Sequence, residues 1–285
     1  MILLASLLLV SQSACEKDID IQLDETEPKL VVDGQIEAGQ SPRIVLTKSL
    51  DYFGALDPAS LRNSFVRNAR LTIAAGGQTF TLIEDSLAVG ANKLYYYTLP
   101  SLKGQLNTAY TLTIQTGGQT YTARTTIPAI NRRIDSVWTE PATVDGDSVT
   151  YARLMMKVTD APGFGDYIRY FTRRNNEPFY PGFNSVFDDQ VVDGKTYTVN
   201  IPRGVNKNEV LEERDLFFRK GDAVVLKLSQ IDKTTYDFWR TFEFNFQSIG
   251  NPFSSPIKVL GNVSNGALGY FGGYAPQFRS LTIPK

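Results

Sequence analysis

The 285-residue chain contains no histidine and only one cysteine. Without histidine it cannot form a serine–histidine–aspartate triad, a cysteine–histidine dyad or a zinc site with imidazole ligands. A single cysteine also cannot form an intramolecular disulfide. These absences exclude the commonest designs of hydrolase and zinc site, and the sequence predicts no cofactor.

Neither sign of charge is in excess, because 29 lysines and arginines against 30 aspartates and glutamates give a net charge of −1. Nucleic-acid binding relies on clustered basic side chains that neutralise phosphates, so no nucleic-acid partner is predicted. Aromatic residues make up 12% of the chain and charged residues 21%. This composition is typical of a folded protein rather than of a disordered chain.

A notable apolar run stands at the start of the sequence. Ile2 to Val10, which is apolar except for Ser6, is nine residues long. A bilayer span needs about 20 apolar residues, so this run suits the apolar part of a signal peptide instead. We predict that residues 1–14 are a lipoprotein signal peptide and that Cys15 carries lipid, which would hold the protein on a membrane. The alternative is a cleaved secretory signal followed by an incidental cysteine.

A short acidic segment follows the cysteine. Its charged residues are Glu16, Lys17, Asp18 and Asp20. The segment resembles the export tag of lipoproteins that Bacteroidota display on their surface, and the alternative is a merely solvated tether. On either interpretation, residues 15–28 form a lipidated, flexible connection. The resemblance implies an outer-membrane location at the cell surface.

Residues 29–130 show the alternation of an antiparallel β domain. Segments 71–81 and 112–122 are nearly the same in sequence, and each contains a Gly-Gly pair. Such a pair supplies the positive φ angles that a two-residue hairpin turn requires. Two hairpins of one immunoglobulin-like β-sandwich explain the repeat better than a propeller, since only two copies occur. Residues 50–68 form either a long loop or a short helix around 58–65.

Residues 131–285 are predicted to form a second β-rich domain with one packed helix. Strands are expected at 151–158, 167–172, 195–201 and 223–231. The fold class is therefore mostly β, with an N-terminal immunoglobulin-like β-sandwich followed by a second β-rich domain with one packed α-helix.

The helix is expected at 233–249, near the end of a β-rich region. Its apolar face would be formed by Trp239, Phe242, Phe246 and Ile249, and we expect this face to pack in the core. Thr234 and Asp237 have the spacing of a capping box. Gly250 stands where a left-handed C-terminal cap belongs.

Carboxylates are the remaining candidates for catalysis or metal binding. Asp188 and Asp189 are adjacent, and adjacent side chains of a strand point to opposite faces, so this pair does not converge by itself. Asp145-Gly146-Asp147 lacks the glutamate of a calcium loop and favours a hairpin turn. The glycine-rich segment 266–274 lacks the lysine of a phosphate loop and favours a strand with close backbone packing. We predict no catalytic residue and no metal ligand, and we expect that the protein is not an enzyme.

An aromatic segment is the best candidate for a binding surface. Its rings are Phe179, Tyr180, Phe183 and Phe187, which stand beside glycine, proline and asparagine. This composition favours irregular structure with exposed rings, and exposed rings bind oligosaccharide, peptide or protein. The alternative is a loop that folds back onto its own sheet.

Several motifs together resemble one known family. They are Cys15, Val31-Val32-Asp33-Gly34, Tyr121-Thr122-Ala123 with Ile127-Pro128, Tyr236-Asp237-Phe238-Trp239-Arg240, Asn251-Pro252-Phe253-Ser254-Ser255-Pro256 and Gly266-Ala267-Leu268-Gly269-Tyr270-Phe271-Gly272. The chain resembles family 4249 of domains of unknown function, a set of Bacteroidota lipoproteins encoded beside TonB-dependent receptors. The resemblance covers the mature chain and carries no catalytic residues.

Two hypotheses about function follow. The resemblance implies an outer-membrane lipoprotein that acts as a non-enzymatic accessory or ligand-capture partner of a TonB-dependent receptor in nutrient uptake. The alternative is a stand-alone surface module that binds glycans or peptides.

Overall fold

A computed structural model of the chain describes residues 27–50, 57–90, 92–249, 251, 253–255 and 257–285. The predicted signal peptide, Cys15 and most of the tether lie outside these residues. Within the described part, the fold is mostly β with one main helix, as predicted. None of its helices is long and apolar enough to cross a membrane.

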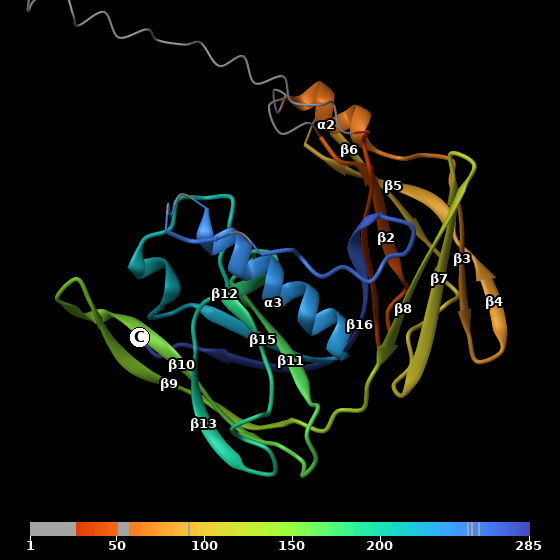
Figure 1. The fold of residues 1–285 in the computed structure, drawn as a ribbon. Coiled ribbons are helices and arrows are strands. Elements are labelled where there is room, and N and C mark those ends of the chain that lie inside the picture. The colour runs from red at the N-terminus through yellow and green to blue at the C-terminus, as the bar shows by residue number, and fades with distance from the viewer. Residues whose placement is uncertain (1–26, 51–56, 91, 250, 252, 256) are drawn as a thin grey trace, which may run out of the picture.

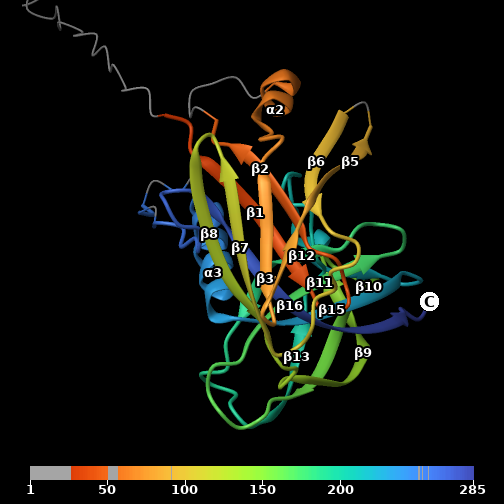
Figure 2. The ribbon, with the colours of Figure 1, turned by 90° about the vertical axis from the view of Figure 1, so that its right-hand side faces the viewer.

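One large sheet of eight strands runs through the molecule (Figures 1 and 2). In spatial order its strands are β12 (Tyr180–Phe187), β11 (Tyr167–Arg174), β15 (Ala223–Ile231), β16 (Leu268–Thr282), β1 (Leu30–Glu37), β2 (Arg43–Lys48), β6 (Asn92–Thr98) and β5 (Ile83–Val89). The pairing of β1 with β16 is parallel, whereas the other neighbours are antiparallel.

Two smaller sheets pack against this large sheet. The first consists of β4 (Gln78–Thr81), β3 (Arg70–Ala75), β7 (Thr108–Thr116) and β8 (Gln119–Ile127). The second consists of β13 (Thr196–Ile201), β10 (Asp147–Thr159), β14 (Phe218–Arg219) and β9 (Arg133–Val144). Figure 1 shows the first small sheet at the right and the second at the lower left, with helix α3 (Lys233–Ser248) between them.

The small sheets enclose separate hydrophobic cores. Leu112 and Ile114 of β7 are fully buried in a core that they share with Ile36 and Ile44 of the large sheet. Full burial of a side chain of this size contributes about 1.5–3 kcal/mol to stability. A second core, which includes Leu154, lies under the second small sheet.

Strand β16 joins the two halves of the chain. It pairs with β1 over Leu268–Tyr274 and with β15 over Tyr274–Thr282. Phe271 belongs to the core of the first small sheet, whereas Ile283, just beyond β16, belongs to that of the second. The first core therefore includes Phe271 and Ala275 from beyond residue 130, and the large sheet also continues across the predicted domain boundary.

The glycines of β16 allow this close contact. Gly269 has a φ angle of +91°, and a side chain there would collide with the backbone carbonyl of Val32. The prediction of a strand with close backbone packing at 266–274 is thus confirmed for the part within β16.

The turn predictions are also confirmed. Gly76, Gly77, Gly117 and Gly118 all have positive φ angles, and each pair closes a hairpin. Asp145 and Gly146, with φ angles of 50° and 81°, form the turn between β9 and β10. Of the two alternatives for residues 50–68, the short helix is present as α2 (Pro58–Ser64), which Asp57 caps. A 3₁₀ helix, η1, spans Glu213–Leu216.

The helix α3 differs from its prediction in two details. Its N-terminal cap is Asp232 rather than Thr234, because the Asp232 carboxylate accepts from the amide of Thr235. The predicted apolar face is wrong in its second half, where Phe242 is 38% exposed and Ile249 is 77% exposed. A polar side chain, Glu243, is buried there instead, because neighbouring residues donate hydrogen bonds to its carboxylate. The predicted cap Gly250 lies outside the described residues.

Candidate functional site

The aromatic segment forms an edge strand, β12, so the prediction of irregular structure there is wrong. The structure also separates its four predicted contact residues. Phe179 lies 6.1 Å from the ring of Phe278, and Tyr180 lines a polar cavity with Arg203. The rings of Phe183 and Phe187 contact other residues.

Phe183 lies beside helix α3, where its ring is 5.9 Å from the Lys207 ammonium. Phe187 stacks on Tyr170 at 6.2 Å and remains 45% exposed. The four aromatics therefore do not form one binding surface. The strand itself nevertheless borders a groove.

This groove, which we call the α3 groove, follows the surface of α3 and has a volume of about 530 Å³. Asn184 and Val186 of β12 line it on one side, and Ile257 and Leu260 line it on the other. Its helix residues include Asp237, Arg240, Phe244 and Gln247. The groove therefore combines charged, amide and apolar side chains.

Hydrogen bonds hold the segment that contains Ile257 and Leu260 against the helix. The side-chain amide of Asn245 accepts from the Ile257 amide at 2.9 Å and donates to the Ile257 carbonyl at 2.5 Å. The amide of Leu260 donates to Thr241 Oγ1 at 3.0 Å. The walls of the groove are thus fixed by α3 itself.

A buried polar network lies beside the groove. Glu243 is 3% exposed, and its carboxylate accepts from the Ser185 hydroxyl at 2.5 Å and the Ser185 amide at 2.9 Å. Lys207 lies 3.2 Å from the same carboxylate, and burial lowers the pKa of this lysine. Arg169 donates to Ser185 and stacks over Trp239 at 3.4 Å.

Ser185 lies at the centre of this network. Ser185 is fully buried, and its hydroxyl already accepts from Arg169 and donates to Glu243. Both hydrogen-bonding directions of this hydroxyl are thus used within the protein, and they join β11, β12 and α3. The network positions β12 against α3.

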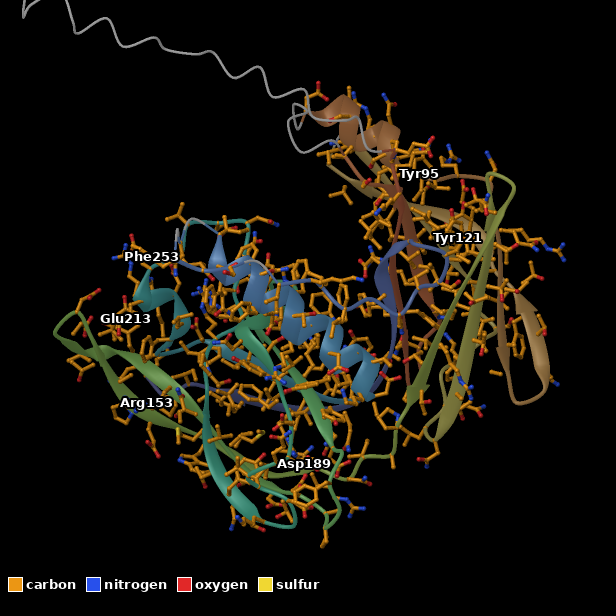
Figure 3. The ribbon with its side chains drawn as sticks, in the orientation of Figure 1. Tyr95, Tyr121, Arg153, Asp189, Glu213 and Phe253 are labelled. Carbon is orange, nitrogen blue, oxygen red and sulfur yellow. The ribbon has the colours of Figure 1, made fainter. Side chains whose placement is uncertain are left out.

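Large apolar side chains project around the C-terminal half of α3. This apolar rim comprises Phe242, Phe244, Ile249, Phe253, Ile257 and Leu260. Phe253, labelled in Figure 3, is 94% exposed. Single exposed apolar residues are ordinary in proteins, but three of these, Phe244, Ile257 and Leu260, also line the α3 groove, and exposed apolar residues at a groove are typical of an interaction surface.

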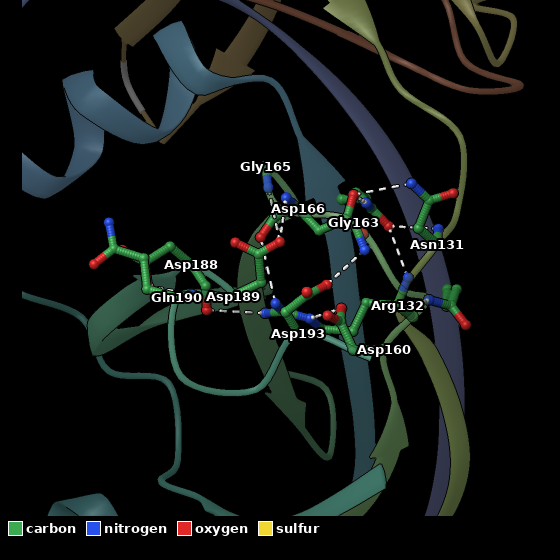
Figure 4. A network of polar contacts seen from close by, with 12 residues as sticks. Asn131, Arg132, Asp160, Gly163, Gly165, Asp166, Asp188, Asp189, Gln190 and Asp193 are labelled. Carbon is green, nitrogen blue, oxygen red and sulfur yellow. Dashed lines mark hydrogen bonds and ion pairs between the residues drawn. The ribbon is translucent and has the colours of Figure 1, made fainter. Parts of the chain in front are cut away.

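A second polar cluster includes Asp189, which follows the end of β12 (Figure 4). Asp160 follows β10, Asp166 precedes β11 and Asp189 follows β12, and all three are buried. Each of these aspartates contributes one carboxylate oxygen to a group of three, and the three oxygens lie within 4.8 Å of one another. We call these three residues the acidic cluster.

The contacts of the acidic cluster come from three loops. Arg132 donates to Asp160 at 2.7 Å, and neither side chain is exposed. Asp189 accepts from the backbone amides of Gly165 and Asp166 at 2.8 and 2.9 Å. Burial raises the pKa of Asp166, and the neighbouring Asp160 and Asp189 raise it further.

The sequence analysis missed this cluster. Asp188 and Asp189 do diverge, as expected, since Asp188 accepts from the Tyr236 hydroxyl at 3.0 Å. The partners of Asp189 instead come from the loop 160–166, more than 20 residues away. No fixed spacing links the three aspartates, so only the fold reveals them.

The fold and these sites define a β-rich protein with a groove and an apolar rim on its main helix. The family model described as "Domain of unknown function (DUF4249)" matches residues 16–279. The chain therefore belongs to the DUF4249 family, which confirms the resemblance seen in its motifs. No curated protein matches the chain.

Proposed function

We propose that the protein is a lipid-anchored, non-enzymatic accessory of a TonB-dependent receptor in the outer membrane. The observation that carries this proposal is the apolar rim, which offers a protein partner several exposed rings, one of which, Phe244, lines the open α3 groove. Aromatic anchors of this kind supply much of the binding energy in protein interfaces.

The N-terminal sequence supports attachment to the same membrane as the partner. The family match begins at residue 16, directly after Cys15. The predicted signal peptide and Cys15 thus precede the matched region, and the apolar run before Cys15 supports a lipid anchor there. A tethered protein also meets a membrane receptor at high effective concentration, so a moderate interface is sufficient.

Co-purification tests the proposal. The tagged full chain, with its native N-terminus, is solubilised from outer membranes in mild detergent, and bound proteins are identified by mass spectrometry. We expect a receptor barrel with the wild type, and at least about tenfold less of it with the double variant Phe244→Ser/Phe253→Ser, because each lost anchor costs 1 kcal/mol or more.

The matched control is Val210→Ser, because Val210 is 96% exposed but lies outside the apolar rim. This variant is expected to retain the receptor. Recovery of no receptor with the wild type, or equal recovery with all three proteins, would contradict the proposal.

The α3 groove favours a second candidate function, the binding of an oligosaccharide or peptide. Asn184, Arg240 and Gln247 offer hydrogen bonds beside the ring of Phe244, a mixture that suits such ligands. Calorimetry of the purified full chain against oligosaccharide and peptide mixtures tests this function. Binding without the receptor, lost in Arg240→Ala, would favour the stand-alone module.

A further inference from the structure

We propose that the acidic cluster of Asp160, Asp166 and Asp189 binds a calcium ion. This site is separate from the α3 groove and does not depend on the proposed function. The argument uses charge balance, hydrogen bonding and ligand chemistry in turn.

The cluster carries more negative charge than the surrounding side chains neutralise. Three carboxylates face the single guanidinium of Arg132, which is paired with Asp160 in a fully buried contact. Other partners of Asp166 are the neutral amides of Asn131 and Gln230, at 2.9 and 2.5 Å. Uncompensated charges are costly inside a protein, and a divalent cation would balance them.

Two oxygens of the cluster have no hydrogen-bond partner among the residues that the structure describes. Asp160 and Asp166 are 1% and 6% exposed, and Oδ2 of each accepts no hydrogen bond from the described residues. Buried polar atoms nearly always have a partner. These two oxygens therefore point independently to a bound group that can satisfy a carboxylate, and a cation does so.

The ligand atoms favour calcium, and their spacing is compatible with it. A set of carboxylate oxygens suits hard cations, namely calcium, magnesium and manganese. Calcium binds oxygens at about 2.3–2.6 Å, so two oxygens on opposite sides of it lie about 5 Å apart. The three oxygens of the cluster fall within 4.8 Å of one another. Magnesium usually keeps several waters, which a buried cluster accommodates less well, so the ligand chemistry favours calcium.

A calcium ion here would join parts of different sheets. Asp160 ends a strand of the second small sheet, whereas Asp166 and Asp189 flank strands of the large sheet. Binding would therefore stabilise the folded protein, because the unfolded chain does not hold these residues together.

Calcium binding is tested on the full chain, purified in detergent and stripped with a chelator. Isothermal titration with calcium chloride and metal analysis measure the stoichiometry, and thermal unfolding is compared in calcium, magnesium and chelator. We expect close to one calcium per chain and a rise in the unfolding temperature with calcium that exceeds any rise with magnesium. Absence of binding, or a shift with magnesium alone, would overturn the proposal.

Two variants and one control make the test specific. Asp166→Asn and Asp189→Asn keep an oxygen for the observed hydrogen bonds, and each is expected to weaken calcium binding by at least about tenfold. In chelator, Asp166→Asn should unfold no earlier than the wild type, because a repulsive charge is gone. Asp193→Asn is the control, since Asp193 accepts from Gly163 in the same region but lies outside the cluster. Calcium binding that survives in both cluster variants would contradict the assignment.

Discussion

At the scale of single residues, the carboxylate of Glu84 shows how one side chain fixes local structure. It accepts from Arg67 at 2.6 Å, from the amide of Asn68 at 2.7 Å and from the hydroxyl of Tyr97 at 3.0 Å. Burial alone would raise the pKa of Glu84, but these hydrogen bonds outweigh it and lower the pKa below its ordinary value of 4.5. Burial raises the pKa of Tyr97 to about 12, so this hydroxyl remains a donor.

We expect Glu84→Gln to lower the free energy of unfolding by about 1–2 kcal/mol at pH 7, through the loss of charge-assisted hydrogen bonds. Because the pKa is lower in the folded than in the unfolded state, this stabilisation is present above about pH 4.5 and is lost as the pH falls through the folded value. Urea unfolding at several pH values measures the difference. The exposed Glu213→Gln is the control, and a wild-type advantage that does not change with pH would refute the prediction.

At the scale of elements, the start of α3 is tied to the rest of the fold. The Asp232 carboxylate caps the helix through Thr235 and also accepts from the Thr125 hydroxyl at 2.7 Å and the Thr126 amide at 2.8 Å. One side chain thus joins the helix to β8.

Substitutions of Asp232 and Thr234 distinguish the observed helix cap from the one that the sequence predicted. Asp232→Ala is expected to destabilise the protein by about 2 kcal/mol or more, because it removes a cap and three further hydrogen bonds, from Thr125, Thr126 and the exposed Thr234 hydroxyl. Thr234→Ala, at the exposed position predicted from the spacing, should change stability by less than about 0.5 kcal/mol. Chemical denaturation measures both, and the reverse order of effects would show that Asp232 is not the cap.

Local chemistry explains what could be predicted from the sequence. The hairpin turns at Gly76-Gly77 and Gly117-Gly118 depend only on neighbouring residues, and the strand Ala223–Ile231 has its predicted bounds. The parallel pairing of β1 with β16 joins opposite ends of the chain, and no local pattern encodes it. No local pattern encodes the acidic cluster either, since Asp189 approaches Asp160 and Asp166 only after two sheets assemble.

At the scale of the whole molecule, β16 makes the two halves of the chain parts of one sheet. Because β1 pairs with β16, it lies beside the part of the large sheet against which α3 packs. Asn184 and Val186 of β12 line the α3 groove, and Asp189 of the acidic cluster follows the same strand, so β12 connects the two proposed sites.

The most direct test of the account is the chemical state of Cys15 in the native protein. Membrane and soluble fractions of the producing cell are separated, and the protein in each is analysed by intact mass and peptide mass spectrometry. The account predicts a protein in the outer-membrane fraction that begins at Cys15 and carries acyl chains on it. Protein recovered from the soluble interior with an unmodified Cys15 would contradict it.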